Sequence, residues 1–351
     1  MLLNIIIAFI SLIGLLVVHE LGHFILAKKF GVKVEEFGVG YPPRLIGKKV
    51  GETIYSINLI PFGAFVRMPG ETEKSDDPHS FSSQPVLKRI LIALAGVISF
   101  WIISIILFSI VFSMGTFVAI SDEVNSEGLI NPKVQIVAIA KNSPAEKAGL
   151  KPGDTITKFT KVKEVQEFTE QYKGKEVVLA IERGKEVFDV KLTPRENPPT
   201  GEGMMGVALA RTAFQSYPWY KAPFKGVQAT YNTTGAVIEG YGDAIKKLFL
   251  RQPTGVTLTG PVGVFRLFTQ ASQMGASYFL QFTGTVAIYI ALFNLLPIPA
   301  VDGGKILFLI IEAIKRKPIN YKIEQNITAV FFGLLLLLMA FITVKDVIRL
   351  F

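Results

Sequence analysis

Four long apolar stretches divide the sequence. They cover residues 2–27, 90–120, 279–313 and 327–344. Each is long enough to cross the hydrocarbon core of a bilayer as a helix, for which about 20 residues suffice. The segments between them show the shorter periods of strands and turns. The pattern therefore predicts a polytopic α-helical membrane protein with four transmembrane helices.

The loop after the first span, residues 28–89, predicts β-structure. Residues 39–45, 53–61 and 63–68 are rich in β-branched and aromatic side chains and are punctuated by Gly and Pro. We expect these runs to form a small hairpin or sheet that is associated with the membrane beside the first helix. The acidic and polar stretch that follows predicts a loop in which His79 is solvated.

Between the second and third spans the composition becomes that of a soluble domain, over residues 121–210. Short strand-like runs alternate there with two helical ones, at 142–150 and 162–172. The first of these helices has Pro in its first turn and Gly at its end. We expect a compact α+β module at the small end of domain sizes.

Residues 211–278 lead from this module to the third span. Residues 218–250 carry scattered aromatics, Lys and Gly and predict a helix along the membrane surface, whereas residues 252–263 predict a loop. The third span is itself interrupted, because residues 293–304 contain two Pro, two Gly, an Asn and an Asp. Irregular backbone at membrane depth is tolerated only where it is buried in protein or lines a cavity.

Basic residues crowd into a few short loops. The net charge is +9, and Lys and Arg concentrate in residues 28–89 and 315–322. By the positive-inside rule these loops are cytoplasmic, so that both termini and residues 121–283 lie outside the cytoplasm. The clustering is a topology signal, and we expect no nucleic-acid partner.

The candidate chemistry lies at the end of the first span, in the run His19-Glu20-Leu21-Gly22-His23. The chain has no Cys, so any zinc ligands must be His, Asp or Glu. Two imidazoles four residues apart lie on one face of a helix and can bind one metal ion, and Glu20 can act as general base on a water beside it. In the alternative interpretation, both His bond to lipid headgroups or backbone at a helix end.

Asp302 is the candidate third ligand. The charge pattern brings the end of the first span and the late part of the third to the cytoplasmic face, so that Asp302 shares the depth of His19 and His23. Two His and one carboxylate leave the fourth position of a zinc ion for water. Alternatively, Asp302 is the N-cap of a helix that begins at Gly303.

Together these features resemble the site-2 intramembrane metalloproteases. The resemblance rests on the His19–His23 motif, the β region, one PDZ-like module and the run Asn294-Leu295-Leu296-Pro297-Ile298-Pro299-Ala300-Val301-Asp302-Gly303-Gly304. The most similar group is the bacterial RseP type, with a PDZ insert between spans two and three. Residues 142–154 resemble the PDZ signature of a helix followed by Gly-Leu-Lys-Pro-Gly-Asp, and Gly260-Pro261-Val262-Gly263 matches a loop found before the third span of relatives.

The resemblance implies a zinc metalloendopeptidase of the bacterial inner membrane that cleaves transmembrane segments of single-span substrates. It assigns zinc binding to His19, His23 and Asp302, the base to Glu20 and substrate contact to Asn294. The family usually has Leu where this chain has Val301, a change that does not touch a ligand. The expected partners are the lipid bilayer and either anti-sigma-factor-like proteins or remnant signal peptides, whose outer segments the PDZ domain binds or excludes.

Two other functions use the same features. A metal transporter could hold its cargo with these ligands, but it would need a path through the membrane and usually inverted repeats, and the sequence shows no repeat. A membrane-tethered PDZ scaffold with a degenerate site would have no need of Glu20. The chain has no phosphate-binding loop, which argues against an ATP-driven protease.

Overall fold

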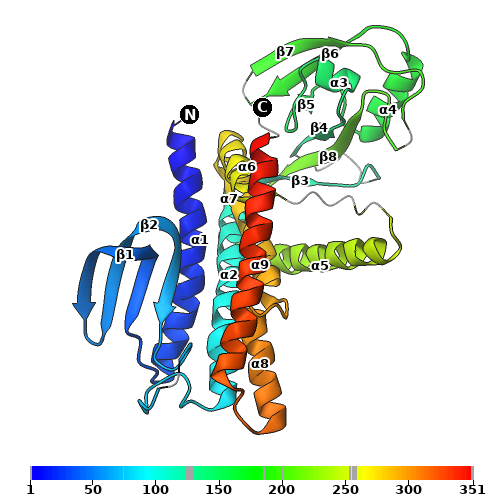
Figure 1. Ribbon diagram of the computed structural model, residues 1–351. Coiled ribbons are helices and arrows are strands. Elements are labelled where there is room, and N and C mark those ends of the chain that lie inside the picture. The colour runs from blue at the N-terminus through cyan, green and yellow to red at the C-terminus, as the bar shows by residue number, and fades with distance from the viewer. Residues whose placement is uncertain are drawn as a thin grey trace. The chain divides into compact units, whose positions relative to one another are not determined.

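The chain folds into two compact units, which are shown in Figure 1. The computed structural model describes residues 2–73, 75–123, 130–184, 186–199, 201–252, 254 and 259–348. Unit 1 comprises Met1–Ile110 and Tyr220–Phe351, and unit 2 comprises Val111–Trp219. Unit 1 holds the long helices and a β-sheet, and unit 2 holds a separate sheet with two short helices.

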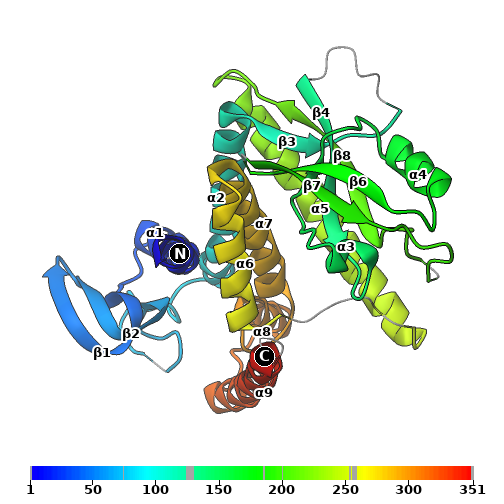
Figure 2. The same cartoon turned by 90° about the horizontal axis from the view of Figure 1, so that it is seen from above.

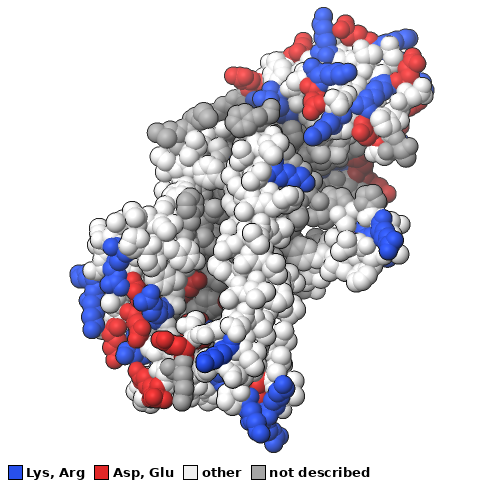
Figure 3. Space-filling view, in the orientation of Figure 1, with Lys and Arg blue, Asp and Glu red and all other residues white. Residues whose placement is uncertain are grey.

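The predicted membrane spans are present as four long apolar helices. They are α1 (Leu2–Lys29), α2 (Val86–Met114), α7 (Ala276–Leu295) and α9 (Tyr321–Ile348), and each is long and apolar enough to cross a membrane. On the face shown in Figure 3, most of the middle of the unit 1 helices carries no charge, whereas Lys and Arg gather toward their lower end and on the sheet. Helix α2 ends earlier than expected because Gly115 has a φ of 86° and a strand follows.

The interrupted segment consists of α7 and α8 (Asp302–Lys315), with non-helical backbone between them. Pro297 and Pro299 cannot donate backbone hydrogen bonds there. Two glycines let α8 begin directly against this backbone. A Cβ on Gly303 would lie 2.1 Å from the carbonyl oxygen of Leu296, and one on Gly304 would lie 2.2 Å from that of Ile298. The break is therefore a packed structure that fixes where α8 starts.

The β region consists of β1 (Glu36–Val50) and β2 (Thr53–Arg67), each 15 residues long. The two strands bend so that one part of β1 pairs with two parts of β2. Residues 36–39 lie opposite residues 54–57 and also opposite residues 64–67. The expectation of three short strands was wrong in number and length, since the Pro and Gly positions fall at bends and not at strand ends. The expected place beside the first helix is confirmed by rings in contact, with Phe24 of α1 5.4 Å from Phe37 and 6.0 Å from Tyr55 (Figure 2).

Two helices precede α7. Helix α5 (Ala222–Phe249) occupies the stretch for which a surface helix was expected, and α6 (Pro261–Gln273) was not predicted. The loop expected at 252–263 is wrong at its end, where Gly260 is an N-cap and Pro261 opens α6; residues 253 and 255–258 lie outside the described part. Asp346 of α9 holds this helix start, because its Oδ2 accepts from the backbone N–H groups of Gly260 at 2.8 Å and Gly263 at 2.9 Å.

Unit 2 is built on a six-stranded antiparallel sheet in the order β3-β8-β4-β5-β6-β7. Its strands are β3 (Thr116–Ala119), β4 (Ile130–Ile139), β5 (Thr155–Ile156), β6 (Val177–Arg183), β7 (Glu186–Leu192) and β8 (Val207–Gln215). The short helices are α3 (Pro144–Lys147), capped by Ser143, and α4 (Val162–Gln171). Alternate strand residues and Val165 of α4 form one buried apolar core, as the strand-like and helix-like runs of the sequence predict.

Candidate metal centre and active site

Helix α1 brings His19 and His23 to one face, one turn apart. Both residues are buried. The ring of His19 stacks on Phe100 of α2, with centroids 4.9 Å apart, and the ring of His23 meets that of His19 edge-on at 4.7 Å. Side chains enclosed between two helices in this way are not positioned to bond to lipid headgroups.

Asp302 completes a tight group with the two imidazoles. Its Oδ2 lies 3.2 Å from His19 Nε2 and 3.5 Å from His23 Nε2, and the two Nε2 atoms are 3.3 Å apart. Ligands at the corners of a tetrahedron, each about 2.0–2.1 Å from a zinc ion, are separated by about 3.3 Å. The three atoms are therefore spaced as a tetrahedral zinc site requires.

The side chain of Asp302 is not used as a helix cap. The N-cap residue of α8 is Val301, and Asp302 is the first helical residue. Its Oδ2 is buried without a hydrogen-bond partner, as is Nδ1 of His19. Burying an unpartnered carboxylate oxygen is unfavourable unless a cation binds it. The donor set and the unpartnered oxygen thus both fit a metal ion.

A contact with α2 sets the orientation of His23. Its Nδ1 is 2.8 Å from the carbonyl oxygen of Ile92. A carbonyl oxygen only accepts hydrogen bonds, so Nδ1 carries the proton and the lone pair of Nε2 faces Asp302 and His19. Metal-binding histidines commonly donate their second ring N–H in this way, which fixes the ring and raises its basicity.

Glycines on both helices allow α1 and α2 to approach closely at the ligands. Gly96 of α2 faces the two imidazoles, and a Cβ there would lie 2.2 Å from His23 Nε2 and 2.6 Å from His19 Cε1. Gly22 of α1 faces the α2 backbone, where a Cβ would lie 2.3 Å from the carbonyl oxygen of Ala95. A side chain at position 96 would occupy space that the ligand atoms need.

Glu20 lines a cavity of about 200 Å³ beside the three ligands. A carboxylate next to a metal site can take a proton from a water molecule and pass it on. Glu20 is not one of the three grouped ligands, which leaves it available for this role. The cavity wall comes from α1, α2, α8, both strands and the loop after β2, and consists of Glu20, His23, Tyr41, Ala64, Phe65, Val66, Met68, Glu71, Phe81, Ile92, Ala93, Asp302 and Lys305.

Two residues considered from the sequence lie apart from this cavity. Asn294, near the end of α7, is half-buried and is not among the residues of the cavity wall. Its contact with substrate therefore stays a prediction. The ring of His79 is 71% exposed in the loop after β2 and lies 3.6 Å from Asp77, which confirms a solvated histidine.

Lys305 and Glu71 belong to the cavity wall although sequence reasoning did not single them out. Lys305 follows Asp302 by one helical turn, and this spacing was the available signal that both lie on one face of α8. Glu71 comes from the loop after β2, where no periodic pattern marks a residue. Lys305 Nζ pairs with Glu71 Oε1 and lies 4.3 Å from the centre of the Phe81 ring.

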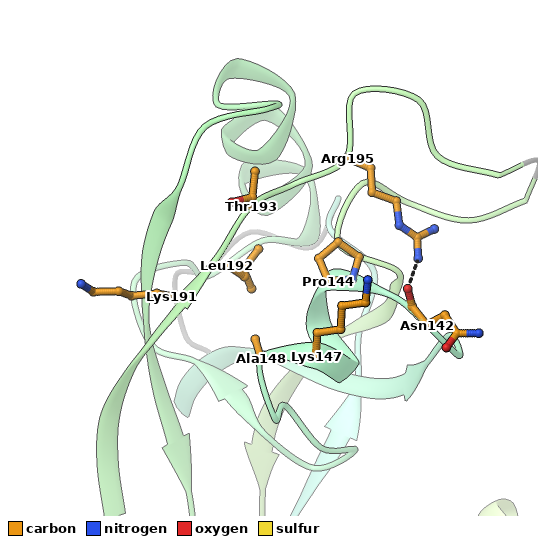
Figure 4. A pocket seen from close by; sticks show the side chains of 8 residues that line it. All are labelled: Asn142, Pro144, Lys147, Ala148, Lys191, Leu192, Thr193 and Arg195. Atoms are coloured by element: carbon orange, nitrogen blue, oxygen red, sulfur yellow. Dashed lines mark hydrogen bonds between the residues drawn. The ribbon is translucent and has the colours of Figure 1, made fainter.

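A second hollow, of about 370 Å³, lies in unit 2 between α3 and the end of β7 (Figure 4). Lys147 points toward the guanidinium of Arg195, whereas Lys191 points away from the hollow. Arg195 is already bonded to the carbonyl of Asn142 at 3.4 Å and to Glu202 at 2.6 Å. No His or carboxylate is among the described residues that line it, which are Asn142, Pro144, Lys147, Ala148, Lys191, Leu192, Thr193 and Arg195, so it offers no ligands for metal chemistry.

Comparison with known proteins places the chain among metalloproteases. Residues 7–338 match the model of the family described as peptidase family M50. The chain is 35% identical to a protein of Clostridium perfringens that is named as a zinc metalloprotease, over 98% of both chains. It is 31% identical to a similarly named protein of Clostridium acetobutylicum, over 98% of this chain and 97% of the other. It is 27% identical to the regulator of sigma-W protease RasP of Bacillus subtilis, over 100% of both chains.

Proposed function

This chain belongs to peptidase family M50, the zinc-dependent site-2 proteases of membranes, and we propose that it cleaves the transmembrane segments of single-span proteins. The observation that carries the proposal is the group His19, His23 and Asp302, which lies among membrane-length helices and beside the cavity that Glu20 lines. Anti-sigma-factor-like proteins and remnant signal peptides are the substrate classes. The relative named regulator of sigma-W protease favours the first of these.

In the proposed mechanism, His19, His23 and Asp302 hold the zinc ion, with His23 oriented by the carbonyl of Ile92. When bound, zinc polarises the scissile carbonyl and makes a nearby water more acidic. Glu20 takes a proton from the attacking water as the new carbon–oxygen bond forms. It then gives a proton to the leaving nitrogen as the carbon–nitrogen bond breaks. We assign substrate binding to Asn294, whose amide can hydrogen-bond to backbone.

The substrate has to reach the cavity in an extended form, because a helix shields its own peptide bonds. We propose that β2 receives it by addition of a strand. Residues 64–67 pair with residues 36–39 of β1, and Ala64, Phe65 and Val66 also form part of the cavity wall. A segment added to this strand would run beside Glu20.

Exchange of Glu20 for Gln tests the assignment. We predict that Glu20→Gln retains near-normal zinc and loses proteolysis, since the amide keeps the shape of the side chain but cannot accept a proton. Zinc is measured by metal analysis of the purified variant, and cleavage is measured with a candidate single-span substrate. Cleavage by the variant at the wild-type rate would remove Glu20 from the mechanism.

We also propose an orientation in the bacterial inner membrane, based on the basic loops. Residues 28–89 and 315–322 face the cytoplasm, and unit 2 is a PDZ domain on the opposite side, together with both termini. Because the native chain has no Cys, single cysteines report topology directly. A cysteine at Lys173 should react with an impermeant thiol reagent in intact cells, and one at Glu73 should not. The reverse pattern contradicts the orientation.

A further inference from the structure

The wall of the active-site cavity contains one fixed ammonium group. Among the described residues that line it, Lys305 is the single lysine or arginine, and it faces a cavity that also has the carboxylates of Glu20, Glu71 and Asp302. The side chain of Lys305 is 22% exposed. A cation so enclosed needs a partner, and Glu71 supplies it. The Phe81 ring lies 4.3 Å from Nζ and holds the ammonium group in place, so that Lys305 and Phe81 form a seat for a carboxylate, which Glu71 fills in this structure.

Peptide hydrolysis produces a carboxylate in the same cavity. Water adds to the carbonyl carbon, the carbon–nitrogen bond breaks, and one fragment ends in a carboxylic acid while the other begins with an amine. The acid is ionised near neutral pH, because a terminal carboxyl has a pKa of about 3.3–3.7. It therefore arises beside two carboxylates that repel it, Glu20 and Glu71, and a cation of the protein in addition to the zinc ion would stabilise it there.

We propose that Lys305 binds the newly formed C-terminal carboxylate of the product, and that Glu71 occupies this seat between turnovers. The proposal rests on the proteolytic function given above. For the product carboxylate to replace that of Glu71 beside Lys305, only the Glu71 side chain has to move away. The backbone beside it is held independently, because Tyr321 and Gln325 of α9 donate to the carbonyl oxygens of Gly70 and Thr72.

The test compares two product-like apolar peptides that differ only at the C-terminus, one a free acid and the other an amide. Binding to the purified zinc-loaded protein in detergent micelles is followed by fluorescence anisotropy. The wild type should prefer the acid by about tenfold, the size expected for a charge-assisted hydrogen bond. Lys305→Met should abolish this preference and Lys305→Arg should keep it. Glu71→Gln should strengthen binding of the acid and leave the amide unchanged, since the internal competitor is gone.

Lys315→Met is the matched control, because Lys315 is exposed at the far end of the same helix and should not affect the preference. If the Glu71–Lys305 pair serves only to tie the loop after β2 to α8, Lys305→Met and Glu71→Gln will each weaken the binding of the acid and of the amide by the same factor. If Lys305→Met still prefers the acid over the amide, the zinc ion and not Lys305 binds the carboxylate. Either result, or no preference in the wild type, overturns the proposal. Binding needs no turnover, so a wild-type protein that cleaves its substrate but shows no preference for the acid rejects this subsite and leaves the proposed function standing.

Discussion

At the scale of single residues, Gly96 leaves the space in which the imidazoles of the proposed zinc ligands His19 and His23 lie. A Cβ at this position would lie 2.2 Å from His23 Nε2, well inside van der Waals contact. We predict that Gly96→Ala lowers zinc affinity by about 10- to 100-fold, the range found when groups that orient a ligand are disturbed. Zinc content after dialysis against a weak chelator measures the effect.

The matched control is Gly235→Ala in α5, where a Cβ meets nothing within 4 Å. That change should keep zinc and stabilise the helix by about 0.5–1 kcal/mol, because Ala is the better helix former. Equal zinc retention in the two variants would show that Gly96 has no part in positioning the imidazoles.

The three candidate metal ligands could be predicted from the sequence, but the contacts that position them could not. The spacing of His19 and His23 marks a shared helix face, and the charge pattern brings Asp302 to the same depth, so all three were named. The carbonyl of Ile92 and the space at Gly96 could not be found in this way. These groups meet the imidazoles through the packing of α2 on α1. Ile92 lies 69 residues after His23, and local periodicity does not report a contact between positions so far apart.

At the scale of elements, Glu36 joins the separate parts of the bent sheet. Its side chain is 6% exposed, and it accepts hydrogen bonds from Ser56 Oγ at 2.7 Å and Arg44 Nε at 3.1 Å, with Arg67 3.7 Å away. Burial acts to raise the pKa of Glu36, but the hydroxyl and the guanidinium groups outweigh it and hold the pKa below the ordinary value of 4.5. The ionised form therefore stabilises the sheet.

A carboxyl whose folded pKa is lowered contributes its full stabilisation above the unfolded pKa and loses it as pH falls through the folded pKa. We predict that the sheet keeps its amide protection from neutral pH down to about 5 and loses part of it in more acidic solution. Hydrogen exchange of peptides from β1 and β2, corrected for intrinsic rates, measures this.

Glu36→Gln should lower the protection already at neutral pH and flatten its pH dependence. The neighbouring Glu35 is exposed, and Glu35→Gln serves as the control with a wild-type profile. Identical profiles for the two variants would refute the role of Glu36.

Long apolar helices were the elements most readily predicted, because their length and composition suffice. Helix α6 was missed because its signals, an N-cap Gly and Pro261, lie in a Gly- and Pro-rich stretch that also fits a loop. Its start is fixed by Asp346, which is distant in sequence. The double pairing of β1 and β2 was missed for a similar reason, since bends look like strand ends in a linear pattern.

At the scale of the whole molecule, the candidate active site lies in unit 1, and the role of unit 2 is open to test. The hollow of unit 2 offers no metal ligand among its described lining residues. If unit 2 is the PDZ domain proposed above, it has two candidate roles. It excludes substrates whose outer part is still bulky, or it binds a newly exposed C-terminus. Deletion of residues 133–193 separates the two roles.

We predict that gating gives a deletion variant with normal zinc that also cuts untrimmed, full-length substrates. Recruitment gives a variant that cuts trimmed substrates more slowly than the wild type does. The measurement is the cleavage rate on both substrate forms, with zinc content as the control for folding. Unchanged rates on both forms would exclude both roles.

The three proposed zinc ligands come from distant parts of the chain. His19 and His23 are synthesised early, and Asp302 follows only when all elements but α8 and α9 have been made. A nascent chain therefore carries two imidazoles that cannot hold zinc tightly until the last part of the protein emerges. With these ligands, metal capture would come late in assembly, after α8 has been made. If these residues hold zinc, the ion stabilises the folded state in which α1 and α8 are joined, since a ligand that binds only this state stabilises it.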